Sequence, residues 1–278
     1  MSQLYLNTCL KASRMVTRNY STSFSLGILS LAKRYRNPIY SIYGFVRFAD
    51  EIVDTFHQHD KESLLNRFEQ DTWLSISDGI SLNPVLHSFQ YAVNKYNIPH
   101  DLIKQFIHSM RMDLSPQHYN NASFKEYILG SAEVVGLMCL CVFCEGDVAM
   151  YERLRPQAMA LGSAFQKINF LRDIKADVFS LGRSYFPGFD PGHFNQQMKQ
   201  EIEADIEADF LQGLEGIKKL PYRSRFGVYV AYVYYHSLFK KIRNLTAERI
   251  LNERVRIPNR KKYGLIVSSY FRHALNML

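Results

Sequence analysis

Hydrophobic positions along the chain recur at steps of three and four residues, the spacing of helices with one buried face. Strand-like alternation bounded by turns is absent, and the one strand-like run, 228–235, has helical flanks. We therefore predict an all-α chain. The expected helices lie near 3–19, 22–34, 38–57, 61–78, 84–97, 100–113, 123–145, 148–178, 195–218, 222–251 and 260–277.

Local signals at helix ends support this division. Pro38 suits the first turn of a helix, where its missing N–H costs nothing. Ser123 and Glu126 have the spacing of a capping box, and Asp60 precedes another helical stretch. No Gly/Ser linker divides the chain, and the longest expected loop is 182–193. We predict one helical domain over residues 1–278.

Composition adds a large core to this picture. A chain of 278 residues buries roughly three-quarters of its unfolded surface, enough for a core with an enclosed pocket. The aromatic fraction of 14% fits either a filled core or a large apolar pocket, and composition alone leaves both open.

The net charge of +8 favours anionic partners such as phosphates or acidic lipids. The cysteines lack the spacing of a zinc site and are expected to be buried and inert: Cys9, Cys139, Cys141 and Cys144. The start of the chain does not resemble a signal peptide, and the apolar run 134–144 is roughly half the length of a bilayer span. A soluble, cytoplasmic protein is expected, with peripheral contact at the inner face of a membrane left open.

A row of polar residues marks the helix after Pro38. Asp50 and Asp54 are four residues apart and point the same way, one turn from Arg47. Two adjacent carboxylates repel each other unless a cation lies between them, and magnesium prefers such oxygen ligands together with substrate phosphate. One Asp-x-x-x-Asp pair alone is more often a solvated helix face.

A second polar row changes that balance. In the stretch GSAFQKINFLRDIKAD a polar stripe runs between apolar flanks, where burial without a partner would be costly. Its members are Gln166, Asn169, Asp173 and Asp177, with Arg172 and Lys175 nearby. Facing the first row across a pocket, this row would complete a cage for magnesium and diphosphate. A transition-metal site at His57, His59 and Asp60 is less favoured than a solvated helix end, because a third well-spaced ligand is not evident.

Five stretches resemble the squalene and phytoene synthases over most of the chain, from about Ser21 to Lys262. They are STSFSLGI (21–28), IYGFVRFADEIVD (42–54), MRMDL (110–114), YILGSAEVVG (127–136) and LGSAFQKINFLRDIKADVFSLGRSYFP (161–187). The last is highly specific, with a Gln-x-x-Asn-x-x-Arg-Asp core followed by Gly-Arg-x-Tyr-x-Pro.

The resemblance implies the isoprenoid-synthase helical bundle with a central cavity, and head-to-head (1′–1) condensation of two prenyl diphosphates through a cyclopropylcarbinyl diphosphate. It assigns Mg²⁺ (or Mn²⁺) to Asp50, Asp54, Asn169, Asp173 and Asp177. The residues implied in substrate binding are Ser21, Phe24, Tyr43, Arg47, Gln166, Arg172, Tyr185 and Arg260. The four aspartates and Tyr127 are the implied catalytic residues.

Several positions depart from the family pattern. The first motif reads Asp-Glu at its start where many relatives have Asp-Asp, and Glu133 stands where a small residue is usual, which puts the pocket shape there in doubt. Phe186 replaces a commoner Leu, which we expect to be harmless. By the same analogy Ile28 and Tyr40 lie near the pocket floor, and Ile28 leaves room for a long substrate.

We favour two geranylgeranyl diphosphates and phytoene as substrate and product. The alternative is farnesyl diphosphate with squalene or dehydrosqualene, and NADPH would be needed only for squalene. A non-catalytic relative that binds a prenyl diphosphate is disfavoured because all four aspartates are present. The basic segment 249–262 lacks interleaved aromatic platforms, so nucleic acid is not expected as a partner, while weak attraction to acidic lipid is. The sequence does not indicate an oligomeric state.

Overall fold

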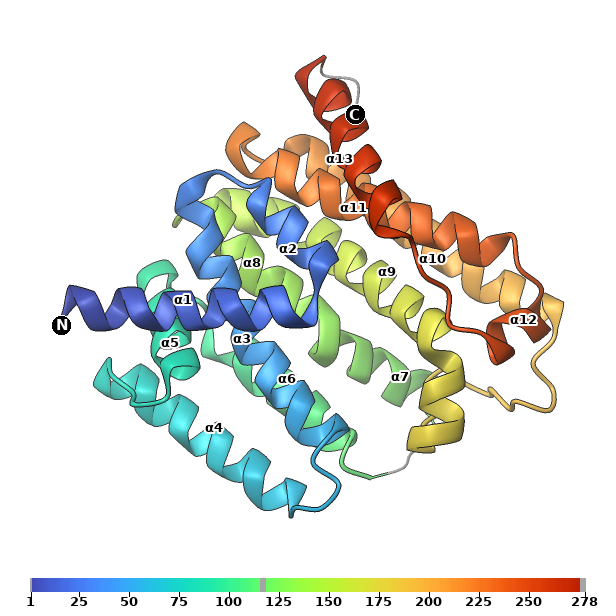
Figure 1. The fold of residues 1–278 in the computed structure, drawn as a ribbon, viewed down its shortest axis with the longest axis horizontal. Helices are drawn as coiled ribbons and strands as arrows, with labels where there is room; N and C mark the ends of the chain where they lie inside the picture. The colour runs from blue at the N-terminus through green and yellow to red at the C-terminus, as the bar shows by residue number, and fades with distance from the viewer. Residues whose placement is uncertain (1, 116–118, 276–278) are drawn as a thin grey trace.

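A computed structural model describes residues 2–115 and 119–275, with the side chains at 180, 181, 259, 261 and 263 left out. The described chain is a bundle of helices without a sheet, which confirms the predicted fold class (Figure 1). The helices are α1 (Gln3–Tyr20), α2 (Thr22–Leu29), α3 (Lys33–Asp54), α4 (Lys61–Asp78), α5 (Pro84–Tyr96), α6 (His100–Met112), α7 (Asn121–Ile128), η1 (Leu129–Glu133), α8 (Val134–Cys144), α9 (Val148–Leu181), α10 (Gln196–Lys219), α11 (Tyr222–Arg243), α12 (Ala247–Asn252) and α13 (Asn259–Ala274).

Helix α3 begins five residues before the predicted start. Pro38 lies inside it rather than in its first turn, so that prediction was wrong. Tyr35, one turn earlier, is fully buried, and its ring meets Phe143 edge-on at 5.7 Å between centroids. Burial of this aromatic ring favours helix on the N-terminal side of the proline despite the lost backbone hydrogen bond.

Two helix starts were predicted with different success. Asp60 caps α4 as expected, accepting a hydrogen bond from the Ser63 N–H at 3.0 Å. The cap of α7 is Asn120 rather than Ser123: the Asn120 side chain accepts from the Ser123 N–H, and the Ser123 hydroxyl accepts from the Asn120 N–H. The capping box exists, but it lies three residues earlier than the sequence suggested.

The predicted helix 123–145 is divided in the structure. Five residues form a π-helical turn, η1, between α7 and α8. A Cβ atom at Gly130 would lie 2.6 Å from both the Gln105 carbonyl oxygen and the Ser109 Cβ, so glycine permits this turn to approach α6 closely. Such turns often occur beside functional sites. The predicted helix 222–251 is likewise divided, into α11 and α12.

The stretch from α7 through α8 is the one described helical segment, Asn121–Cys144, long and apolar enough to cross a bilayer. However, 67% of its most apolar window is buried inside the protein. It therefore fits the core helix of the bundle. The four cysteines are free, and Cys9, Cys141 and Cys144 are buried.

Two hydrophobic clusters fill the bundle. One joins α3, α5, α6 and α8, and the other joins α9, α10 and α11. Figure 1 shows α3, α8 and α9 crossing the middle of the molecule, with α4 and α5 on one flank and α10 to α13 on the other. The two polar rows predicted from the sequence lie on α3 and α9, between these clusters.

Candidate active site

A cavity of about 640 Å³ lies between α2, α3, η1, α8, α9, α10 and α11. One part of its wall is polar and includes Asp50, Asp54 and Asp173. Another part is apolar and includes Leu31, Ile39, Leu140, Phe143 and Leu154. The cavity can therefore hold a molecule with a polar head and a long apolar tail, as ligand sites with few polar groups on an apolar lining do.

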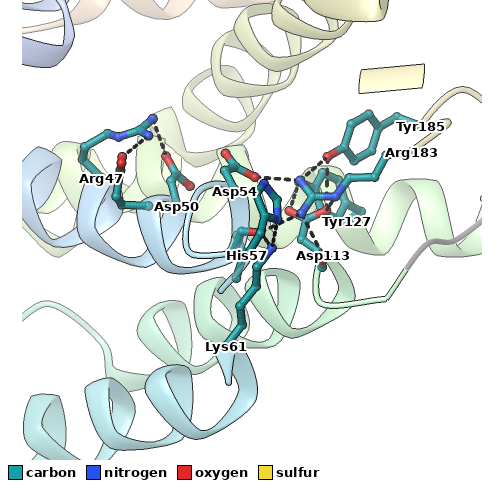
Figure 2. Close-up of polar contacts among 11 residues, drawn as sticks. Arg47, Asp50, Asp54, His57, Lys61, Asp113, Tyr127, Arg183 and Tyr185 are labelled. Atoms are coloured by element: carbon teal, nitrogen blue, oxygen red, sulfur yellow. Dashed lines mark hydrogen bonds and ion pairs between the residues drawn. The ribbon is translucent and has the colours of Figure 1, made fainter. Parts of the chain in front are cut away.

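The α3 row presents two carboxylates to this cavity. Burial, and next the charge of Asp54, raise the pKa of Asp50 to about 7. Arg47 Nη2 donates to Glu51 Oε2 at 2.5 Å, and Arg47 Nη1 lies 3.9 Å from Asp50 Oδ2 (Figure 2). The Arg47 guanidinium also stacks 4.5 Å from the centre of the Tyr20 ring. A positive charge is thus held beside the carboxylates at the cavity wall.

The α9 row faces the same cavity through Gln166, Asn169, Arg172 and Asp173. Arg172 Nε donates to Asp173 Oδ1 at 3.0 Å. Asn169 accepts a hydrogen bond from the Tyr235 hydroxyl at 3.3 Å. The two polar rows therefore line one cavity, as their spacing predicted.

Asp177, the last member of the α9 row, does not line the cavity directly. Burial, together with the charges of Asp173 and Asp54, raises the pKa of Asp177 to about 7. The Asp177 carboxylate is therefore repelled by acidic residues of both rows. Such mutual repulsion is relieved when a cation binds between the groups.

A buried network that we did not predict supports the end of the α3 row. Arg183, in the segment after α9, donates to Asp54 Oδ1 at 2.7 Å, to the Val53 carbonyl at 3.1 Å and to the Asp113 carbonyl at 2.8 Å (Figure 2). The Tyr127 hydroxyl donates to Asp113 Oδ2 at 2.5 Å, and the Tyr185 hydroxyl donates to Asp113 Oδ1 at 3.1 Å. Burial raises the pKa of Asp113 to about 6, although Arg183 opposes the rise.

Neither Asp113 nor Arg183 belongs to a row of polar residues at helical spacing, so the sequence pattern alone did not mark them as candidate site residues. The signal that could have found them was the resemblance, since MRMDL and the Gly-Arg-x-Tyr-x-Pro run contain both residues. Their partners come from α3, α6, α7 and the segment after α9, so only the folded chain brings them together.

The predicted metal ligands fit a divalent cation in their donor chemistry. Asp50, Asp54, Asn169, Asp173 and Asp177 offer oxygen atoms, which magnesium prefers and manganese accepts. Burial raises the pKa values of Asp50 and Asp177 most, and neighbouring aspartates add to the rise, an effect that a bound cation would oppose. Over residues 2–115 and 119–275, however, these side chains do not gather into a preformed group of three or more ligands. Arginines pair with three of these carboxylates. Arg47 lies beside Asp50, Arg183 beside Asp54, and both Arg172 and Arg254 beside Asp173.

The histidines after α3 form a different arrangement. Lys61 Nζ lies 3.0 Å from His57 Nδ1 and donates to the Val53 carbonyl at 2.8 Å, while Asp60 caps α4 (Figure 2). The Lys61 ammonium group thus already contacts one of the two histidines. This agrees with a helix end and gives the transition-metal alternative no support.

A profile of the squalene/phytoene synthases matches residues 17–261. The chain belongs to the squalene/phytoene synthase family. Enzymes of this family are prenyltransferases that act on prenyl diphosphates, so this chain is a prenyltransferase. The family assignment confirms the resemblance seen in the five sequence stretches.

Similar proteins agree with the family. The chain is 28% identical over 286 residues to phytoene synthase from Arthrospira platensis, covering 90% of this chain and 88% of that one. It is 27% identical over 261 residues to a chloroplastic phytoene synthase from an Oncidium hybrid cultivar, covering 85% of this chain but only 62% of the longer relative. A dehydrosqualene synthase solved in complex with a ligand superposes with a TM-score of 0.80 over 96% of each chain, at 18% identity. The structural likeness establishes the shared fold.

The residues implied by family membership divide into two groups in the structure. Ser21, Phe24, Tyr43 and Tyr127 line the cavity. Phe24 and Tyr43 contact each other with ring centroids 5.4 Å apart, and burial raises the pKa of Tyr43 to about 12. Ser21 also caps α2 by accepting from the Phe24 N–H at 3.2 Å. Their aromatic faces and hydroxyl groups lie near the carboxylates.

Two other implied residues do not line the cavity. Tyr185 lies outside the cavity lining, where its hydroxyl donates a hydrogen bond to Asp113. Arg260 is exposed at the start of α13. In the basic segment it is Arg254, rather than Arg260, that lines the cavity, with its Nε 2.6 Å from Asp173 Oδ1. Arg254 lies in the extended segment after α12, which passes beside the cavity. Pro258 then precedes α13, which packs on α11.

The three described residues that depart from the family pattern, Glu51, Glu133 and Phe186, do not line the cavity. Glu133 does not line the cavity, although its neighbours Ala132 and Val135 do. Its pKa is raised to about 7 by burial and by the charge of Asp209, against the effect of Lys167. Ile28 lines the cavity. Tyr40 is buried next to the lining residue Ile39 and does not line the cavity itself.

Proposed function

We propose that this chain condenses two prenyl diphosphates head to head in a magnesium-dependent reaction, with geranylgeranyl diphosphate as substrate and phytoene as product. The observation that carries the proposal is a single cavity in which two acidic rows and three arginines adjoin an apolar lining. An anionic diphosphate fits the polar part and an isoprenoid tail fits the rest.

The residues of the polar wall have separable tasks. Arg47 and Arg172 are placed to donate to diphosphate oxygens, which stabilises the departing anion as the allylic carbon–oxygen bond breaks. Asp50 and Asp54 on α3, with Asn169, Asp173 and Asp177 on α9, would hold the magnesium ions. Magnesium supplies further neutralisation of the leaving diphosphate when bound.

Aromatic side chains suit the positive charge left on the substrate. Phe24 and Tyr43 line the cavity together, and Phe165 and Tyr235 stack there with centroids 4.0 Å apart. The faces of such rings attract cations. The apolar part of the lining also limits the access of water to the cation before the second substrate attacks it.

The choice of geranylgeranyl diphosphate is supported by the two phytoene synthases described above. Ile28 also places a medium-sized side chain at the cavity rather than an aromatic ring. The alternative is farnesyl diphosphate, which would give dehydrosqualene, or squalene if NADPH reduces the intermediate. Dehydrosqualene synthase activity belongs to a protein that shares the fold at 18% identity.

The deciding experiment incubates the purified chain with magnesium and either substrate, with and without NADPH, and identifies the lipid by mass spectrometry. Phytoene from the C20 substrate, formed without NADPH, is the expected result. Dehydrosqualene or squalene formed only from the C15 substrate would overturn the choice of substrate and keep the reaction class. An Asp50→Asn/Asp173→Asn variant is the matched inactive control. Folded protein that yields no product from either substrate would favour the non-catalytic alternative.

A further inference from the structure

Helix α13 packs on the bundle through one narrow face. Ser269 and His273, four residues apart, are buried against α11. The His273 ring lies 5.3 Å from Phe226 and 4.6 Å from Tyr222 between centroids. These contacts fix which side of α13 points toward the protein.

The opposite face of α13 is apolar and exposed. Val267, Phe271 and Leu275 follow one another at steps of four, so they form one stripe. Their exposed fractions are 57%, 59% and 67%, and Tyr270 beside them is 58% exposed. Clustered large apolar side chains on a surface commonly mark a contact with a protein or a membrane.

The charge of this region selects between such partners. From Arg254 to Leu275 the sequence contains no Asp or Glu. The basic residues of the same stretch are Arg254, Arg256, Arg260, Lys261, Lys262 and Arg272. An apolar helix face flanked by positive charge is typical of helices that lie in the interface of a membrane with anionic lipids.

The position of α13 connects this face to the cavity. Lys262 Nζ donates to the Thr22 hydroxyl at 2.9 Å and lies 5.4 Å from the centre of the Tyr234 ring. Tyr234 lines the cavity, and so do Ser21 and Ser23 on either side of Thr22. In Figure 1, α13 crosses α11 and runs outward to the edge of the molecule.

We infer that the Val267–Phe271–Leu275 face of α13 docks on the surface of a bilayer that contains anionic phospholipids. The apolar stripe enters the headgroup boundary, and the exposed Arg256, Arg260 and Arg272 contact the lipid phosphates. Docking places the polar end of the cavity close to the membrane surface. The benefit of that placement to a lipid-metabolising enzyme depends on the proposed function, but the docking itself does not.

The test measures binding of the whole chain to sucrose-loaded vesicles by sedimentation, with phosphatidylcholine alone or mixed with phosphatidylglycerol. We expect binding to the anionic vesicles that weakens as salt is raised. Val267→Asp/Phe271→Asp should weaken it at least tenfold, and Arg272→Gln, which removes one positive charge, should weaken it about fivefold. The matched control is Leu82→Asp, which changes a side chain that is 92% exposed on the far flank and should bind as the wild type does.

Three results would overturn the inference. One is equal binding by wild type and Val267→Asp/Phe271→Asp, with both proteins folded by circular dichroism. Another is light scattering that shows a dimer dissociated by those substitutions, with no vesicle binding by the wild type. The third is binding to duplex DNA, but not to anionic vesicles, at the same salt concentration. If the wild-type protein binds the vesicles but shows no synthase activity in detergent, that result would count against the proposed function alone.

Discussion

Arg183 Nη1 lies 2.7 Å from Asp54 Oδ1, which joins the segment after α9 to the last turn of α3. The same guanidinium donates to the carbonyl oxygens of Val53 and Asp113. One side chain therefore sets the position of a carboxylate in the first acidic row relative to the end of α6. Its five N–H groups in a rigid plane suit this task better than a lysine would.

Arg183→Met should lower kcat about 10- to 100-fold, because a small displacement of Asp54 disturbs the alignment of the reacting groups. Arg183→Lys keeps the charge but cannot donate to all three partners, so most of the loss should persist. The measurement is steady-state turnover at saturating substrate and magnesium. Arg111→Met is the control, since Arg111 joins α6 to α4 through Asn66 and Glu69 away from the cavity. An unchanged kcat in Arg183→Met would show that the network does not position Asp54.

Ile28→Phe should shift the preference of the enzyme toward farnesyl diphosphate. Ile28 is 4% exposed and lines the cavity, so a larger ring there removes space for the longer isoprenoid tail. The ratio of kcat/KM for the C15 and C20 substrates measures the effect, and we expect a change of about tenfold. Tyr40→Phe is the control: Tyr40 is buried outside the cavity and its hydroxyl has no hydrogen-bond partner among the described residues. An unaltered ratio in Ile28→Phe would refute this model of the cavity.

Glu133 should make stability depend on pH. Its pKa in the folded chain is raised from 4.5 to about 7, so between these values the folded state holds the proton more tightly than the unfolded state does. The contribution of protonated Glu133 is therefore complete below pH 4.5 and is lost as the pH rises through 7. Glu133→Gln should raise the melting temperature relative to wild type at pH 8 and leave it nearly equal at pH 4.5. Thermal melts at both values test this.

The exposed Glu152 on α9 provides the comparison for Glu133. Glu152→Gln should show no such growing difference from wild type between pH 4.5 and pH 8. A melting-temperature difference for Glu133→Gln that is the same at both pH values would mean that the effect comes from packing rather than from titration.

Lys167 should be important for stability. It is 7% exposed, donates to Asp209 Oδ2 at 2.8 Å and also pairs with Asp205. Lys167→Met would leave Asp209 without its cation beside Glu133, at a cost of about 3 kcal/mol in the free energy of unfolding. Chemical denaturation measures the loss. The double variant Lys167→Met/Asp209→Asn should recover part of it, and a double variant as unstable as the sum of the two single variants would exclude this coupling.

Much of the fold followed from helical spacing, because apolar residues at steps of three and four specify which face of each helix is buried. The run 228–235 shows this, since its flanks indicated helix and it lies within α11. Boundaries were less accurate where a distant contact outweighed a local signal. Pro38 suggested a helix start, but the burial of Tyr35 against Phe143 extended α3 past it.

The site shows the same division. The two acidic rows could be read from the sequence because residues four apart on a helix necessarily share a face, and both rows line the cavity. The Asp113–Arg183 network and the contact of Arg254 with Asp173 could not, since their members lie 70 and 81 positions apart in the sequence (183 − 113 and 254 − 173). Sequence spacing determined what each helix presents. Only the packing of helices on one another decided which of those side chains meet, because contacts across the bundle depend on how each face buries its apolar surface.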